Sequence, residues 1–97
     1  MESITINVKV LPEKRDEFLQ TVRVLYRDIE KEKGFKRSAL FQDVDDETRF
    51  NLNTTWEKRE DLDNYLKSEL YKILMGAVKV LGEHHEIHSY TAFREAG

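Results

Sequence analysis

Cysteine is absent from this 97-residue chain, and proline occurs only once. Without a thiol, the chain forms no disulfide, offers no thiolate to a metal and has no cysteine nucleophile. No apolar run is long enough to span a bilayer, and the first residues lack the basic and apolar regions of a signal peptide. We therefore expect a cytoplasmic protein with no membrane partner.

An excess of basic residues is also missing, since the formal net charge is -3. Affinity for nucleic acid comes mainly from a basic surface that displaces counterions from phosphates, so we expect no nucleic-acid partner. Hydrophobic residues make up 39% of the chain and charged residues 36%, which supplies one apolar core and a solvated exterior. A chain of this length supports one core only, so we expect a single domain over residues 1–97.

The first third of the chain predicts a strand followed by a helix. Apolar and polar residues alternate over residues 4–10, which is the pattern of a half-buried strand. Pro12 suits the first turn of a helix, and Gly34 is the predicted end of that helix. The helix should bury one face at helical spacing, formed by Phe18, Val22, Leu25 and Ile29.

The remainder predicts a hairpin, two helices and a last strand. Alternating patterns over residues 35–42 and 48–56 flank the polar turn "DVDDE". Residues 57–66 favour a short helix, and residues 68–81 a longer one with Ser68 as its N-cap and Gly82 as its stop. Residues 85–93, rich in aromatic and β-branched types, favour a strand. The face of the longer helix should comprise Leu70, Ile73, Leu74, Ala77, Val78 and Leu81.

The order βαββαβ, with its second helix in two pieces, is the ferredoxin-like α+β arrangement. Such a fold has a four-stranded antiparallel sheet with helices on one face. No further element covers the opposite face, and the pattern places apolar residues on both. We therefore expect a homodimer that buries the second face.

The segment "NTTWEKREDLDNYLKSELYKIL" joins a strand ending in Trp to an acidic short helix, an "L-x-S" step and a third helix. In this pattern the chain resembles the antibiotic biosynthesis monooxygenase family of dimeric α/β-barrel proteins, and the similarity covers nearly the whole chain. The family includes cofactor-free oxygenases of polyketide anthrones, quinol monooxygenases and haem-degrading enzymes. The resemblance implies a small-molecule ligand held between sheet and helices.

At two positions the chain departs from the family pattern, and these departures limit which ligands and cofactors of the family we expect it to bind. Haem-degrading members place a His where this chain has Tyr65, so a proximal haem ligand is missing and we expect no cofactor. Oxygenases commonly carry an Asn four residues before the strand-end Trp, where this chain has Leu52. Asn51 and Asn53 flank that position, and the alternation of a strand directs both amides away from the face that carries Trp56.

Two interpretations of Trp56 are open: its indole fills space in the core, or it lines an apolar pocket that binds a planar substrate. A tyrosine presents an apolar ring and a polar tip to a hydroxylated ligand, although a buried tyrosine more often bonds the backbone. The predicted substrate-binding residues are Phe50, Leu52, Trp56, Tyr65 and Tyr71.

Histidines cluster in "GEHHEIHSY", where His84, Glu86 and His88 alternate and should share one side of a strand. Such spacing is compatible with a divalent metal, but strand starts are often exposed, and we predict solvated or dimer-contact histidines and no metal site. The catalytic residues are not defined by the sequence. His85 and His88 are weak candidates for a general base, because a histidine pKa lies near neutrality.

The leading hypothesis is a cofactor-independent monooxygenase of a small planar or hydroxylated, quinol-like or polyketide-like molecule. Two alternatives remain, a noncatalytic binding or dimerisation module and an isomerase of a small phosphorylated sugar. A continuous apolar cavity favours the oxygenase, a polar pocket with a bound anion the isomerase, and a filled core the module.

Overall fold

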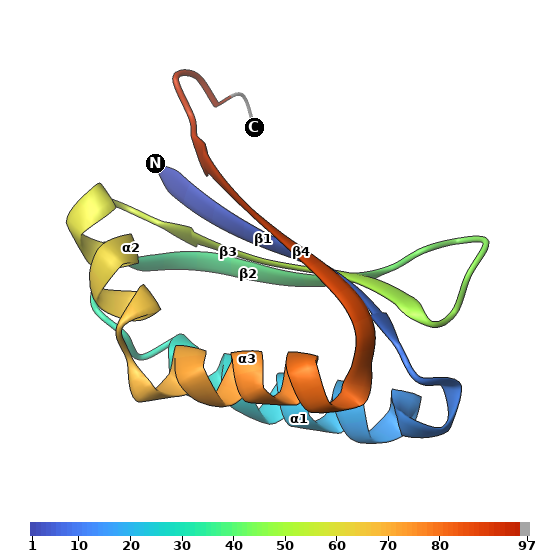
Figure 1. Ribbon diagram of the computed structural model, residues 1–97. Helices are drawn as coiled ribbons and strands as arrows, with labels where there is room; N and C mark the ends of the chain where they lie inside the picture. Colours follow the sequence, from blue (N-terminus) through green and yellow to red (C-terminus); the bar gives the residue numbers. More distant parts are fainter. Residues whose placement is uncertain (96–97) are drawn as a thin grey trace.

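Four strands form one antiparallel sheet in the order β2-β3-β1-β4 (Figure 1). The computed structural model describes residues 1–95. In chain order its elements are β1 (Glu2–Val10), a 3-10 turn (Pro12–Lys14), α1 (Arg15–Ile29), β2 (Phe35–Gln42), β3 (Arg49–Trp56), α2 (Arg59–Leu66), α3 (Glu69–Leu81) and β4 (Gly82–Thr91). The predicted ferredoxin-like α+β fold is confirmed, with the second helix in two pieces.

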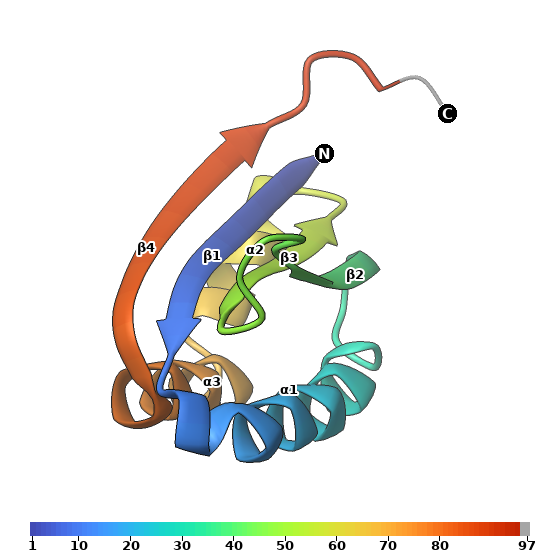
Figure 2. The same ribbon diagram turned by 90° about the vertical axis from the view of Figure 1, so that its right-hand side faces the viewer.

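The helices all lie on one face of the sheet, with α1 and α3 side by side beneath it and α2 at one end (Figures 1 and 2). The strand alternation turns one side of β1 and β3 toward them. That inner face carries Ile4, Ile6, Val8 and Val10 from β1 and Phe50, Leu52, Thr54 and Trp56 from β3, all buried. None of the described helices is long and apolar enough to cross a membrane.

Helix α1 ends at Ile29, so the predicted end at Gly34 is wrong. The four residues after Ile29 are all charged and give the core no apolar side chain, and the chain therefore turns there. Gly34 lies in this turn with a φ of 80°, next to the buried carboxyl group of Asp61. A conformation with positive φ favours glycine, which explains the residue at this corner.

Helix α3 follows its prediction at both ends but not along its whole face. Ser68 is the N-cap, and Gly82 follows the helix directly as the first residue of β4, earlier than the predicted strand start. Ile73, predicted to be buried, is 49% exposed, whereas Met75 is buried. The buried stripe is centred on Leu74, Val78 and Leu81, one residue further round the helix than the pattern indicated.

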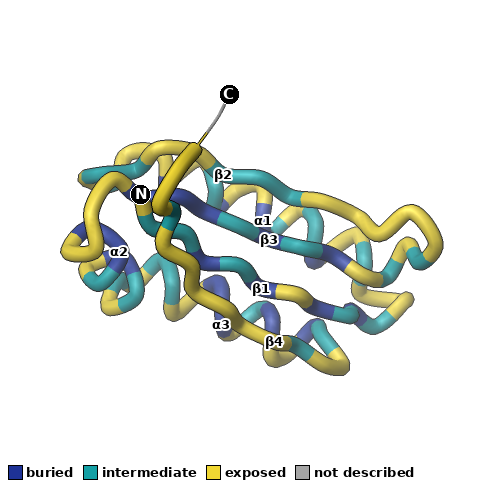
Figure 3. Tube along the Cα trace, turned by 90° about the horizontal axis from the view of Figure 1, so that it is seen from above, coloured by how far each residue is buried: buried dark blue, intermediate teal, exposed yellow. Residues whose placement is uncertain are grey.

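The outer face of the sheet is the side seen in Figure 3. Its residues are mostly polar, which corrects the expectation of apolar residues on both faces. The register places residues that are directly opposite one another on the same face. Its central strands present Ser3, Thr5, Asn7, Lys9, Arg49, Asn51, Asn53 and Thr55. Apolar and aromatic side chains occur only at the margins, at Ala39 and Phe41 on β2 and Tyr90 on β4.

Candidate functional site

Trp56 is the last residue of β3 and is 0% exposed. Its indole Nε1–H donates a hydrogen bond of 2.9 Å to the Oγ1 atom of Thr54, which lies two residues earlier on the same strand face. The ring of Phe35 meets the indole edge-on, with 5.8 Å between centroids. The indole is therefore enclosed, with its one polar group satisfied inside the protein.

Two tyrosines from the helical layer extend this aromatic group. Tyr65 of α2 stacks on Trp56 with 4.6 Å between ring centroids and 24° between planes, and Tyr71 of α3 meets Tyr65 edge-on at 5.2 Å. We call Phe35, Trp56, Tyr65 and Tyr71 the aromatic cluster. The predicted substrate-binding residues Trp56, Tyr65 and Tyr71 thus lie together, at the end of the sheet next to α2.

Ser68 fixes the junction between the two helices that carry these tyrosines. Its hydroxyl donates to the Tyr65 carbonyl oxygen at 2.6 Å and accepts from the Tyr71 backbone N–H at 3.2 Å. This N-cap contact therefore also sets the positions of both rings. The cap was predicted from the sequence, but its effect on the two tyrosines depends on the break between α2 and α3.

Burial controls the chemistry of the tyrosine hydroxyls. Loss of solvation raises the pKa of Tyr65 well above its usual range, and the neighbouring Tyr26 and Tyr71 add to this effect. Burial likewise raises the pKa of Tyr26 and of Tyr71. These groups stay protonated at neutral pH, so they act as hydrogen-bond donors and not as bases. Tyr26 donates to the carbonyl oxygen of Ala39 at 3.4 Å.

A small pocket of about 120 Å³ opens onto the aromatic cluster. Glu32 and Lys33 come from the turn between α1 and β2, Asn64 comes from α2, and Trp56 and Tyr65 complete the lining. Ligand sites usually enclose roughly 300–1,000 Å³, so this pocket admits only part of a ring system. The sequence does not identify these three polar residues as part of a site, because they lie in charged stretches of the kind that usually form solvated surface.

Phe50 and Leu52 lie on the same sheet face as Trp56 but in a separate part of the core. Phe50 packs against Phe18 at 5.4 Å between centroids, and the Arg15 guanidinium carbon lies 5.6 Å from its ring centroid. Six residues along β3 separate Phe50 from Trp56, which is about 20 Å. Neither residue lines the pocket beside Trp56.

The candidate bases His85 and His88 lie apart from the aromatic cluster. His88 is paired with Thr5 and faces outward, on the opposite side of the sheet from Trp56. His85 is half-buried beside Val8, six residues along β1 from the position paired with Trp56. Neither imidazole can therefore exchange a proton with a ligand held against the Trp56 indole of its own protomer.

The alternate residues of β4 do share one side, as predicted. The Nε2 atoms of His84 and His88 lie 3.6 and 3.5 Å from the carboxylate oxygens of Glu86. All three side chains are exposed on the outer face. Among residues 1–95, no group of three or more His, Cys, Asp or Glu side chains is placed to hold a metal ion.

The asparagines of β3 point away from Trp56, as strand alternation predicted. Asn51 donates to the Asn7 side-chain oxygen at 2.7 Å, and Asn53 donates to that of Asn51 at 3.1 Å. The pairing of β1 with β3 runs without a shift in register, so no bulge returns either amide to the inner face.

Solved structures with the same architecture come from several organisms. A protein from Deinococcus radiodurans has a TM-score of 0.90 at 15% identity, over 100% of this chain and 97% of that one. A variant of SnoaB, a cofactor-independent oxygenase from Streptomyces nogalater, has a TM-score of 0.85 at 16% identity, over 97% and 94%. A conserved protein from Methanosarcina mazei has a TM-score of 0.84 at 21% identity, over 92% and 89%. At such low identities these likenesses show the fold alone.

A comparison with curated proteins finds no match. The family model described as antibiotic biosynthesis monooxygenase matches residues 1–76, which is most of the chain. The match includes the segment of residues 53–74 on which the resemblance was based, and it agrees with the observed βαββαβ fold. The chain belongs to the antibiotic biosynthesis monooxygenase family.

Proposed function

We propose that this protein is a cofactor-independent monooxygenase of a small planar or hydroxylated molecule, quinol-like or polyketide-like. Family membership supports the reaction class. The observation that carries the proposal is the stacked pair of Trp56 and Tyr65 beside a small pocket at this end of the core. The indole supplies an apolar wall, and the Tyr65 hydroxyl supplies a hydrogen-bond donor.

The proposed reaction requires few catalytic groups from the protein. The substrate loses a proton and becomes an electron-rich anion, which reduces O₂ and forms a carbon–oxygen bond to it as a hydroperoxide. The O–O bond then breaks with loss of a second hydrogen from the substrate, so one oxygen atom stays on the substrate and the other leaves as water; the substrate supplies both hydrogens of that water and all four electrons. The protein binds and desolvates the substrate and assists the proton transfer. Tyr65, kept protonated by burial, donates to the substrate oxyanion. Because His85 and His88 lie elsewhere, we assign the proton-accepting role to the carboxylate of Glu32 at the pocket mouth.

The wall beside Glu32 must move for a fused ring system to enter. Glu32 and Lys33 belong to a turn without regular secondary structure, and Lys33 is exposed. A substrate that displaces these two side chains enlarges the opening without disturbing a strand or helix. The aromatic cluster behind them is held by Thr54 and Ser68 and keeps its arrangement.

A second function is favoured by the burial of the indole. Trp56 is fully buried and its N–H is bonded to Thr54, as expected for a core residue. A filled core suits a noncatalytic binding or dimerisation module. In that case the ring of Trp56 contributes to folding, and the pocket beside it binds no substrate.

We also propose that residues 1–97 form one domain and that two copies pair through the sheet, with β4 taking part. Strand β4 is an edge strand of 10 residues, and its outer edge is open to pairing with another strand. Two large aromatic residues on or just after it are exposed: Tyr90 at 56%, on the outer face, and Phe93 at 98%. A second copy that covers them removes apolar surface from water.

Oxygen uptake decides between oxygenase and module. A panel of quinols, anthrones and flavonoids is first screened by quenching of the single tryptophan, and each binder is then tested with an oxygen electrode. We expect at least one binder to consume oxygen, Tyr65→Phe and Glu32→Gln to lower the rate at least tenfold, and Glu30→Gln, an exposed residue of the same turn, to leave it unchanged. If no panel member quenches or is oxidised, the oxygenase is replaced by the module.

A further inference from the structure

Lys33 brings a positive charge to the small pocket beside the aromatic cluster. Of the five residues that line this pocket, it is the one with a basic side chain. Ammonium groups and N–H donors are the groups with which proteins bind oxyanions. The proposed reaction passes through an anion of the substrate, so a positive charge at this position can act on the reacting molecule.

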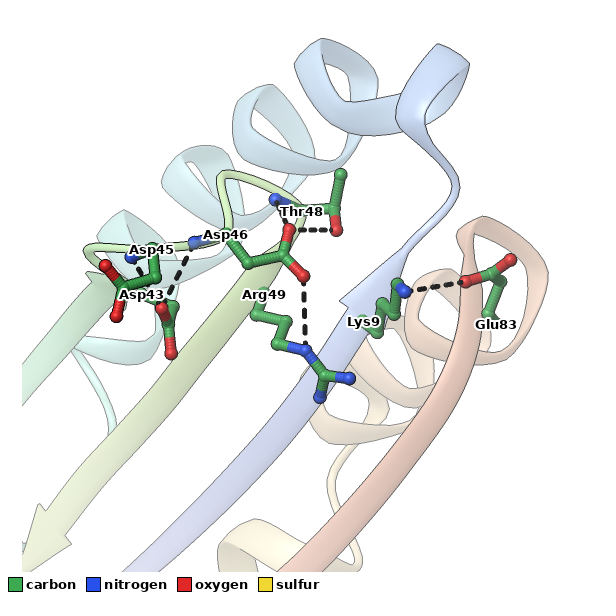
Figure 4. Close-up of polar contacts among 7 residues, drawn as sticks. All are labelled: Lys9, Asp43, Asp45, Asp46, Thr48, Arg49 and Glu83. Atoms are coloured by element: carbon green, nitrogen blue, oxygen red, sulfur yellow. Dashed lines mark hydrogen bonds and ion pairs between the residues drawn. The ribbon is translucent and has the colours of Figure 1, made fainter.

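Lys33 differs from the basic residues of the sheet in having no acidic partner. On the outer face, the Nζ atom of Lys9 lies 3.9 Å from the Glu83 carboxylate. Arg49 forms a second ion pair there, with 3.2 Å between its Nε atom and the Asp46 carboxylate (Figure 4). The ion pairs in the part of the chain that the structure describes do not include Lys33. A ligand therefore pairs with this ammonium group without breaking an ion pair within the protein.

The turn that carries Lys33 has a fixed backbone on both sides of this residue. The carbonyl oxygen of Glu32 accepts from the Phe35 N–H at 3.2 Å, and the carbonyl oxygen of Gly34 accepts from the Glu57 N–H at 2.8 Å. The Lys33 side chain is exposed, and its four-carbon stem adapts to a ligand while the backbone keeps its position.

The pocket has room for one aromatic ring. Its volume is about 120 Å³, and an apolar cavity of roughly 150 Å³ is enough to hold benzene. Trp56 and Tyr65 are buried and supply the aromatic wall, whereas Lys33 and Asn64 are exposed and supply polar donors on the solvent side. A single ring with one oxyanion thus fits the pocket as it stands, and a fused ring system fits only after side chains move.

The proposed proton transfer also requires a positive charge at the substrate oxygen. A phenol has an ordinary pKa of about 10 and a glutamic acid one of about 4.3, so transfer between them is unfavourable unless the phenolate is stabilised. In the transfer to Glu32 the substrate O–H bond breaks, its electron pair stays on the oxygen, and the proton binds to the carboxylate. An opposite charge nearby lowers the pKa of the phenol, and Lys33 supplies that charge beside the Tyr65 donor.

We propose that Lys33 binds the ionised oxygen of a one-ring phenol, with the Asn64 amide as a second donor. The substrate class is then a monocyclic phenol or quinol that the site holds as its anion. The inference rests on the proposed oxygenase site, but it concerns binding of the anion and not the reaction of that anion with oxygen.

The probe para-nitrophenol tests the site without oxidation, because it is a one-ring phenol that ionises near neutral pH to a yellow anion. The protein is titrated into the probe at a pH just below the pKa of the probe. We expect saturable binding with a rise in phenolate absorbance, since the ammonium group favours the anion. Para-nitroanisole, the neutral methyl ether, and a nitronaphthol, the fused-ring analogue, should each bind at least tenfold more weakly. No saturable binding, no rise in phenolate absorbance, or equal affinity for either analogue would overturn the proposal.

Substitutions separate a built site from general attraction between charges. Lys33→Met should weaken binding of the probe at least tenfold and abolish the rise in phenolate absorbance, whereas Lys33→Arg keeps the charge and should retain most of the affinity. Asn64→Ala should weaken binding less. Lys31→Met makes the same charge change at an exposed residue of the same turn that does not line the pocket, and it should leave binding unchanged. Equal losses in Lys33→Met and Lys31→Met would overturn the proposal.

Oxygen uptake by the same variants distinguishes this inference from the proposed function. If para-nitrophenolate binds through Lys33 but no phenol consumes oxygen, the anion site is confirmed and the oxygenase proposal is wrong. If a phenol is oxidised by Lys33→Met at the wild-type rate, the oxygenase is confirmed and the role of Lys33 is overturned.

Discussion

The indole of Trp56 is stacked on the ring of Tyr65 at 4.6 Å, while its N–H is bonded to Thr54 on its own strand. The first contact joins the sheet to α2, and the second satisfies the polar atom of the largest buried side chain. Tyr65 lines the small pocket, and Thr54 is bonded to Trp56, which also lines it. Changes at Trp56 therefore affect both folding and any ligand that enters from the Glu32 side.

Replacement of Trp56 by Phe separates these two roles. The variant loses part of a buried ring and leaves the Thr54 hydroxyl without its donor, so we expect the free energy of unfolding to fall by about 1–3 kcal/mol in urea denaturation. If the indole also walls the substrate site, affinity for a quinol that quenches the wild-type protein should fall at least tenfold.

Thr54→Val is the matched control for that variant. It removes the acceptor but keeps the indole, so it should destabilise the fold while leaving quinol affinity near the wild-type value. Should Trp56→Phe reduce stability yet bind the quinol as tightly as the wild type, Trp56 is a structural residue and the wall of the site lies elsewhere.

The buried tyrosines make the fold sensitive to high pH. The pKa values of Tyr26 and Tyr65 in the folded protein are raised above the ordinary value of 10.0, whereas the unfolded chain ionises near that value. Above about pH 10 the unfolded state therefore releases protons that the folded state retains, and stability falls as pH rises. Each tyrosine contributes a slope of at most about 1.4 kcal/mol per pH unit.

Denaturation with urea between pH 8 and 11.5 measures this effect. The free energy of unfolding should be lost progressively above pH 10 and be fully present below it. Tyr65→Phe should reduce the slope, since the phenylalanine has no proton to lose. A flat profile up to pH 11.5 would contradict the burial of these hydroxyls.

Replacement of glycine by alanine should change the free energy of unfolding in opposite directions at two positions. Gly34 has a φ of 80°, and a Cβ there would overlap the Asp61 carboxyl group, so Gly34→Ala should lower the free energy of unfolding by more than about 1 kcal/mol. A Cβ on Gly76, inside α3, meets no atom within 4 Å, so Gly76→Ala should raise it by about 0.5–1 kcal/mol. Thermal denaturation of both variants checks the pair, and a stabilising Gly34→Ala would show that the corner relaxes.

Local periodicity accounts for most of the fold. Alternation over β1 and β3 identified the inner face, and the same alternation correctly turned Asn51 and Asn53 away from Trp56. The predictions of burial fail where packing between neighbouring elements determines which side chain is covered. Ile73 and Met75 flank the buried stripe of α3, and the neighbouring layers determine which of the two is covered.

The candidate site was predictable only in part. Trp56, Tyr65 and Tyr71 carry an aromatic signal in the sequence, and the fold brings them together. Glu32, Lys33 and Asn64 carry none, because they lie in charged stretches about 30 residues apart that meet only after α2 packs at the end of the sheet.

Dimerisation through the sheet is testable at one residue of β4. Sedimentation equilibrium at micromolar concentration should give twice the 11.5 kDa mass of the monomer. Tyr90 is 56% exposed on the outer face near the end of β4, and Tyr90→Lys would place a charge in the contact, so we expect this variant to sediment as a monomer. Val24→Lys makes a similar change at a residue that is 52% exposed on α1, away from the sheet, and should remain a dimer. A wild-type protein found only at 11.5 kDa would rule out the dimer, and equal dissociation of both variants would place the contact on the helices.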